Sequence, residues 1–255
     1  MPPRFGKLDS KAWGDKYARE IHGFHTEPME LKKAHILNLN HEIDDDLADF
    51  LTPKAMHPSI PAYATVTVVS APESPMGPFV YGEVKVACRA GVRPRDFVLR
   101  SFCNNPEAAR ELSQRWGYPM TVGDAKMIVR HDRIQGKVTL EGLVILEMEM
   151  FDRDFLSGND IQYIANMHLA RNTEDGVLTL VQIDPEYVFH RAERGRPILH
   201  ALDNAAWGDS EGHLKLRNPI SMSYAIADIE LPAIRYVTDP ERDAFRGTTK
   251  VAKAA

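Results

Sequence analysis

Three polar side chains alternate with valines along one stretch of the sequence, and together they could move protons. Residues 79–89 have the sequence FVYGEVKVACR. Successive side chains of an extended strand point to opposite faces, so Tyr81, Glu83 and Lys85 share one face and the valines share the other. The valine face is typical of a core. Charged residues on the polar face are most often exposed to solvent, but on a cavity wall Glu83 would serve as a general acid or base.

Strand-like segments that could position such a face dominate the sequence from residue 62 onwards. They are predicted at residues 62–70, 79–89, 125–131, 137–151, 162–170, 176–184 and 221–237. An earlier strand is predicted at residues 34–40, and helices at residues 44–51 and 105–114, where Pro106 suits the first helical turn. Many strands and few helices, without regular alternation, favour a mixed sheet or barrel with peripheral helices.

The composition argues against several classes of protein. The 255 residues carry a formal net charge of −5, and the basic residues are scattered among acidic ones, so no nucleic-acid surface is indicated. No apolar run is long enough to span a membrane and the N-terminus lacks a secretory signal, which predicts a cytoplasmic protein. Two cysteines cannot form a disulfide framework, and His22 and His25 lack further metal ligands nearby. No metal or other cofactor is expected.

Four short stretches, taken in order, resemble the acetoacetate decarboxylase superfamily. They are KAHI from Lys33, GPFVYGE from Gly77, RELS from Arg110 leading to WGYP from Trp116, and AIADIELP from Ala225. The resemblance implies an α+β fold in which a β-rich, closed, barrel-like sheet with peripheral helices surrounds a central cavity. It also implies a homo-oligomer. We expect one such domain over residues 31–240, between an irregular N-terminal arm (residues 1–30) and a flexible tail (residues 241–255).

Met120 occupies the position at which this chain departs from the superfamily. In the family, a lysine after the Tyr-Pro of this motif forms a Schiff base with a substrate ketone, which allows a β-carboxylate to leave as carbon dioxide. That amine must be uncharged, so its pKa has to fall from about 10.4. Here Tyr118 and Pro119 are followed by Met120 and Thr121, and neither side chain has an amine. The resemblance therefore implies that the family's usual reaction is lost.

Other positions match the family better and define a candidate site. Glu83 falls where the family has a pocket glutamate, and Tyr81 precedes it at the expected spacing. Lys33 falls where the family often has an arginine that holds a substrate carboxylate, and a lysine can form that ion pair without the bidentate geometry. The resemblance places Tyr118 and Met120 in the loop beside the substrate, where methionine would favour an apolar or aromatic ligand.

Two further residues each keep two interpretations. His35 follows Lys33 by two residues and is either a general acid or base near neutral pH or a histidine at the edge of the sheet. Arg110 either lines the pocket or forms a structural ion pair with Glu111 behind the loop. The spacing of these residues does not decide between the alternatives.

The sequence supports three functional hypotheses. The first is a lyase-type enzyme that acts on a small or aromatic oxo- or hydroxy-acid by acid–base catalysis, with Glu83 and Tyr81 as its catalytic residues. The second is a protein that binds a small organic acid or aromatic ligand without chemistry. The third is a decarboxylase with a relocated amine at Lys85 or Lys126, although a carboxylate beside Lys85 favours the charged amine and opposes attack. The expected partners are a small molecule and further copies of the chain.

Overall fold

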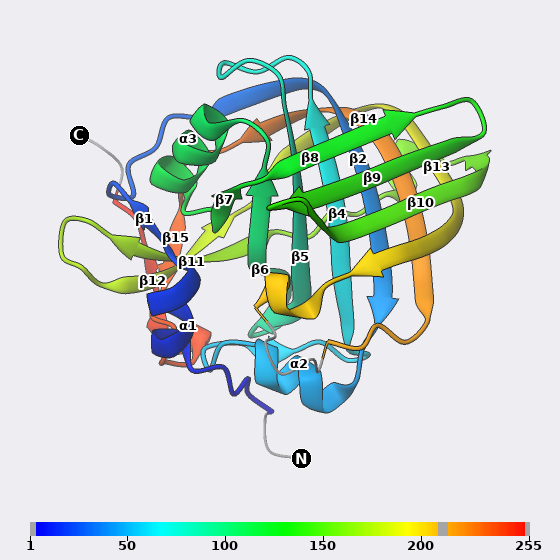
Figure 1. The fold of residues 1–255 in the computed structure, drawn as a ribbon. Coiled ribbons are helices and arrows are strands. Elements are labelled where there is room, and N and C mark those ends of the chain that lie inside the picture. Colours follow the sequence, from blue (N-terminus) through cyan, green and yellow to red (C-terminus); the bar gives the residue numbers. More distant parts are fainter. Residues whose placement is uncertain (1–3, 209–213, 253–255) are drawn as a thin grey trace.

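Strands rich in valine, isoleucine and threonine form one mixed sheet, and short helices lie at its margins (Figure 1). The structure is a computed structural model that describes residues 4–208 and 214–252. Its helices are α1 (Ser10–Tyr17), α2 (Asp45–Leu51), α3 (Pro106–Trp116) and α4 (Ala244–Gly247), with 3-10 turns η1 (Gly158–Asp160) and η2 (Asn204–Trp207). Its strands are β1 (Arg19–Ile21), β2 (Met29–Glu42), β3 (His57–Pro58), β4 (Tyr63–Ala71), β5 (Phe79–Ala90), β6 (Arg93–Cys103), β7 (Met120–Val122), β8 (Asp124–Val129), β9 (Arg133–Leu140), β10 (Leu143–Phe155), β11 (Asn166–Asn172), β12 (Leu178–Ile183), β13 (Glu186–Leu202), β14 (Pro219–Leu231), β15 (Tyr236–Thr238) and β16 (Thr248–Lys250).

The sheet is open rather than closed. It follows the order β16–β15–β12–β11–β6–β5–β4–β2–β14–β13–β10–β9–β8, and in the described part of the chain its end strands β16 and β8 do not pair with each other. The α+β class predicted from the sequence is confirmed, whereas the predicted closure into a barrel is wrong. The β8 end of the sheet folds across β4, β5 and β6 and packs on them through side chains, instead of completing a hydrogen-bonded ring (Figure 1).

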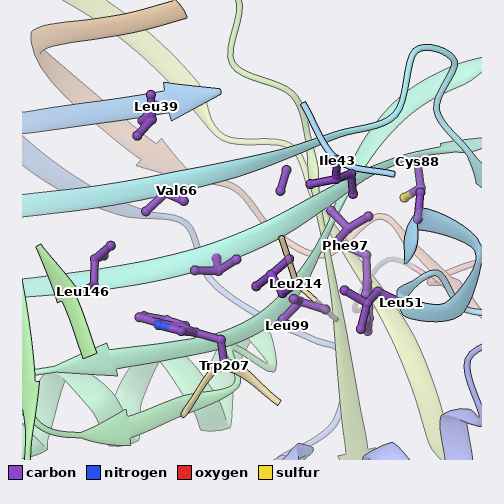
Figure 2. Packing of buried hydrophobic residues seen from close by; sticks show 14 of the residues in the cluster. Leu39, Ile43, Leu51, Val66, Cys88, Phe97, Leu99, Leu146, Trp207 and Leu214 are labelled. Carbon is purple, nitrogen blue, oxygen red and sulfur yellow. The ribbon is translucent and has the colours of Figure 1, made fainter. Parts of the chain in front are cut away.

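The main core fills the space between these two layers of the sheet. Leu39, Val66, Leu146 and Trp207 are fully buried there (Figure 2). The layers approach closely at Gly82 on β5, where an added Cβ atom would lie 2.4 Å from a methyl group of Val138 on β9. This packing supports one face of β5 along its length, so the opposite face of the strand is held in a fixed position.

A second core lies on that opposite face of the central strands, where side chains of α3 pack. This helix begins at Asn105, whose side chain accepts from two backbone N–H groups of the first turn, and ends at Gly117, which has a φ of 69°. Trp116 in its last turn is fully buried and donates its indole N–H to the carbonyl oxygen of Pro232 at 2.8 Å. The helix predicted at residues 105–114 is therefore confirmed.

Both ends of the chain contribute structure. Asp9 caps α1, Trp13 on that helix is buried, and Ile21 is fully buried where β1 pairs with β11. The prediction of an irregular N-terminal arm is therefore wrong for residues 10–21, because a helix of two turns and a strand of three residues are too short to show a period. Part of the predicted flexible tail forms α4 and β16, and residues 253–255 lie outside the described residues.

Candidate functional site

A cavity lies within the second core, between the central strands and the aromatic side chains opposite them. Its volume is about 30 Å³. Its polar lining comes from Asn38, Thr67, Tyr81, Glu83, Lys85, Tyr118, Tyr163, Asn166 and Tyr187, and its apolar lining from Leu31, Ile36, Val69, Leu112, Pro185, Ile229 and Leu231. The small size favours a small ligand over a large aromatic one.

The alternation of residues along β5 aims a carboxylate and an ammonium group into this cavity. Tyr81, Glu83 and Lys85 line it, as the sequence pattern allowed, while Val84 on the other face packs in the main core. Glu83 is 2% exposed and Lys85 is 7% exposed. Lys85 Nζ lies 3.3 Å from Glu83 Oε1. Glu83 Oε2 is buried and has no hydrogen-bond partner among the described residues, so it remains available to a bound molecule.

Asp96 on β6 is a second buried carboxylate, on the far side of Lys85. Its Oδ2 atom lies 3.9 Å from Lys85 Nζ, and the residue is 3% exposed. Burial raises the pKa of Asp96 to about 6, the charge of Lys85 opposes that rise, and the charge of Glu83 adds to it. Lys85 therefore lies between two carboxylates. Asp96 was not predicted from the sequence, although it directly precedes the apolar run Phe-Val-Leu.

His168 on β11 packs against Tyr118, and its imidazole is uncharged. Its Nδ1 atom is 3.0 Å from the carbonyl oxygen of Trp116, and its ring centroid is 3.9 Å from that of Tyr118. Because a carbonyl oxygen only accepts, Nδ1 carries the proton and Nε2 is a free acceptor. Complete burial lowers the pKa of His168 to about 3, so the imidazole is neutral at pH 7. The sequence did not predict this residue, which lies in the apolar stretch MHLA.

Tyrosine hydroxyl groups supply uncharged donors around the cavity. Burial raises the pKa of both Tyr81 and Tyr118, so their hydroxyl groups stay protonated. Tyr163 and Tyr187 also line the cavity; both are half-buried, with ring centroids 4.9 Å apart. Neither residue was predicted from the sequence, because they come from segments with no matching motif.

The structure does not bring Met120 or Arg110 to this cavity. Met120 is 3% exposed but pairs with Ser101, which in turn pairs with Glu83, so one strand separates Met120 from the carboxylate. Met120 instead lines a shallow surface hollow beside α3, together with Arg110. The side chain of Arg110 is 59% exposed and pairs with Glu111 at 3.4 Å. Tyr118, two residues before Met120, is the loop residue that reaches the cavity.

Lys33 also lies outside the cavity, contrary to its expected position as a carboxylate anchor. Its side chain is 66% exposed, and Nζ pairs with Glu73 at 2.8 Å. The backbone is irregular here: Lys33 has a φ of 51°, and its N–H donates to the carboxylate of Asp228 at 2.8 Å. The irregularity shifts the register of β2 against β14 and turns Lys33 away from the site.

His35 and Lys126 are placed elsewhere as well. Ile36 and Asn38 line the cavity, so by alternation His35 faces the other side of β2. There its Nδ1 atom lies 2.6 Å from the hydroxyl oxygen of Tyr224, and burial lowers the pKa of the imidazole. Lys126 is exposed and pairs with Asp124 at 2.9 Å. Of the two candidate amines, only Lys85 reaches the cavity.

Comparison with known proteins gives the family. The family model described as acetoacetate decarboxylase (ADC) matches residues 17–240. The chain therefore belongs to the acetoacetate decarboxylase family. No curated protein matches it.

Three solved structures show how widely this fold is used. The acetoacetate decarboxylase of Legionella pneumophila subsp. pneumophila str. Philadelphia 1 aligns with a TM-score of 0.72 and 17% identity, over 83% of this chain and 88% of that one. The enduracididine biosynthesis enzyme MppR complexed with pyruvate gives 0.65 and 14%, over 82% and 88%. An acetoacetate decarboxylase-like enzyme from Sphingomonas wittichii RW1 gives 0.65 and 12%, over 88% and 93%. At such identities the likeness shows the fold alone.

Two absences apply to the described part of the chain. No helix there is long and apolar enough to cross a membrane. No group of three or more His, Cys, Asp or Glu side chains could hold a metal ion there.

Proposed function

We propose that this chain is an enzyme that moves a proton on a small oxo compound in a lyase-type step, such as dehydration or retro-aldol cleavage. Glu83 acts as the general acid or base. The observation that carries the proposal is the state of its carboxylate: Oε1 is held by Lys85, and Oε2 is buried beside a cavity without a partner among the described residues. A fixed carboxylate with a free oxygen is suited to proton transfer.

The neighbouring groups match the charge that such a transfer creates. When Glu83 removes a proton from the carbon next to a carbonyl group, the C–H electron pair passes to the carbonyl oxygen and forms an enolate. The ammonium group of Lys85 and the hydroxyl groups of Tyr81 and Tyr118 line the same cavity and can stabilise that oxygen. Loss of a β-substituent from the enolate, with its electron pair, completes a lyase step.

Exchange of carbon-bound hydrogen with solvent tests this role directly. The methyl hydrogens of butane-2,3-dione can be followed by proton NMR in deuterated buffer. We expect the protein to accelerate exchange and Glu83→Gln to slow it by at least about 100-fold, because the amide cannot accept the proton. Glu73→Gln makes the same change at the exposed partner of Lys33 and should leave the rate unaltered. Full exchange activity in the Glu83→Gln variant would contradict the proposal.

Imine chemistry at Lys85 is the second candidate, favoured by one observation: in the described chain, Lys85 is the only lysine on the cavity wall. Borohydride added to the same mixture reduces an imine to a stable amine, which peptide mass mapping locates. A label on Lys85 would replace the acid–base scheme with the imine scheme. Stabilisation by the diketone without any exchange would instead indicate a binding protein.

A further inference from the structure

The cavity wall offers no free cation to a carboxylate. In the part of the chain that the structure describes, Lys85 is the only cationic residue that lines the cavity. Its Nζ atom is already 3.3 Å from Glu83 and 3.9 Å from Asp96. An additional carboxylate would therefore compete with two resident ones for a single ammonium group.

Lys33, which the family resemblance suggested as the carboxylate anchor, and other basic side chains near the site are engaged elsewhere. Lys33 is exposed and paired with Glu73. Arg110 is exposed on α3 and lines a different hollow. His168, which contacts Tyr118, is buried, and its lowered pKa keeps it neutral at pH 7. None of these groups can balance the charge of an acid bound at Glu83.

The buried groups around Lys85 thus carry excess negative charge. Glu83 and Asp96 supply two carboxylates against one ammonium, and Asp96, with its pKa raised to about 6, is mostly ionised at pH 7.5. Bringing a like charge into a desolvated site is strongly unfavourable. A carbonyl oxygen meets no such penalty, because the tyrosine hydroxyl groups and Lys85 are donors.

We infer that this site takes an uncharged oxo compound, an aldehyde or ketone without a carboxylate, rather than an oxo-acid. The inference rests on the proposed function in one respect, namely that the cavity at Glu83 is the substrate site. It excludes decarboxylation as the reaction of this chain, because an uncharged substrate has no carboxylate to lose. The inference therefore departs from the first hypothesis from the sequence, which named an oxo- or hydroxy-acid as the substrate.

Butane-2,3-dione and pyruvate form a matched pair for testing the inference, since they differ mainly by a methyl group in place of a carboxylate oxygen. Binding of each is measured at pH 7.5 by ligand-observed NMR and by the shift in melting temperature. We expect the diketone to bind at least about tenfold more tightly than pyruvate. Equal or tighter binding of pyruvate would overturn the inference.

Two variants that each remove one charge test whether the cavity causes the difference in affinity between the diketone and pyruvate. Asp96→Asn removes one negative charge beside Lys85 and should narrow the gap between the two ligands by several-fold. Lys33→Met removes an exposed cation and should leave the gap unchanged. If Lys33→Met weakened pyruvate binding selectively, Lys33 would be a carboxylate anchor and the inference would be wrong. A gap that Asp96→Asn left untouched would also contradict it, because the resident carboxylates would not be its cause.

The two proposals fail in different ways. Preferential binding of the diketone without proton exchange would sink the proposed function and leave the charge preference standing. Exchange of pyruvate protons as fast as those of the diketone would keep Glu83 as the proton-transfer group and remove the charge preference.

Discussion

Asp96 has a pKa that its surroundings raise toward neutral pH. It is 3% exposed, and burial raises its pKa from 3.8 to about 6 despite the ammonium group of Lys85 nearby. Asp96 and Glu83 both lie near Lys85, so the charge of the site changes with pH as Asp96 ionises. A residue of this kind affects both the stability of the fold and the ligand that the cavity accepts.

Replacing Asp96 by Asn should therefore change stability in a pH-dependent manner. Between about pH 4 and pH 6 the folded chain keeps a proton on Asp96 that the unfolded chain has lost, so the stability of the natural protein falls as pH rises through this window. Asparagine cannot ionise. The free energy of unfolding of Asp96→Asn, relative to the natural protein, should rise by about 1–3 kcal/mol from pH 4 to pH 7.

Urea unfolding at a series of pH values measures that difference. His168, with its lowered pKa, contributes equally to both proteins and so cancels. A relative stability that stays flat or falls with pH would show that the buried site does not oppose the charge of Asp96.

The sequence revealed half of this charged cluster. Glu83 and Lys85 were placed on one face because β5 alternates regularly with valines, and a strict period of two fixes which side chains point together. Asp96 directly precedes the apolar run Phe97–Leu99, and His168 lies between Met167 and Leu169. Such a residue shows that something polar is buried, but it does not show which other strand it meets.

At the scale of elements, the turn after α3 is the piece that joins helix, loop and cavity. Gly117 ends the helix with a φ of 69°, the carbonyl oxygen of Trp116 just before it holds His168, and Tyr118 just after it lines the cavity. An added Cβ atom on Gly117 would lie 2.7 Å from that of Ala170. Both the backbone angle and the available space therefore require glycine.

We expect Gly117→Ala to lower the free energy of unfolding by about 2–4 kcal/mol, combining left-handed backbone strain with overpacking. Gly142 provides the control, because its φ is 83° and nothing lies within 4 Å of an added Cβ atom. Gly142→Ala should cost only about 1 kcal/mol for the backbone. Urea unfolding of the two variants gives both values, and equal losses would mean that the contact with Ala170 is relieved without cost.

The β2 strand shows why the sequence misplaced two site residues. Lys33 was expected at the substrate from the family resemblance, and His35, two residues later, was either a cavity residue or a structural histidine. The register of β2 against β14 shifts near Lys33, and His35 faces the opposite side from the cavity residues Ile36 and Asn38. A bulge adds one residue to a strand without changing its composition, so a side-chain pattern does not reveal it.

At the scale of the whole molecule, the N-terminal helix is part of the packed structure. Trp13 on α1 is 7% exposed, and Gly208 at the end of η2 lies so close that an added Cβ atom would be 2.2 Å from the indole ring. Segments near residue 13 and residue 208 are thereby joined beside the main core. The class of fold could be inferred from the sequence. The contact between Trp13 and Gly208 could not, because it joins segments that are distant in the sequence.

Trp13→Ala should accordingly lower the free energy of unfolding of the entire chain by about 3–5 kcal/mol, as expected for loss of a large buried side chain. Phe245 is the matched control, since it is aromatic but 89% exposed. Phe245→Ala should change stability by no more than about 0.5 kcal/mol. One cooperative transition, shifted only in the Trp13 variant, is the expected result in thermal and urea melts. A separate early transition would show that α1 unfolds on its own.

The charged side chains that line the cavity and Tyr163, which also lines it, come from different kinds of segment. Glu83 and Lys85 come from the middle of β5, which is paired on both sides by β4 and β6, whereas Tyr163 lies in the segment between η1 and β11, outside any strand. Substitution of Tyr163 therefore disturbs no strand pairing, whereas Tyr187 lies in β13 and Glu83 and Lys85 lie in β5. Substrate range and reaction type can therefore evolve through substitutions at different residues. Laboratory selection for new substrates should begin at Tyr163.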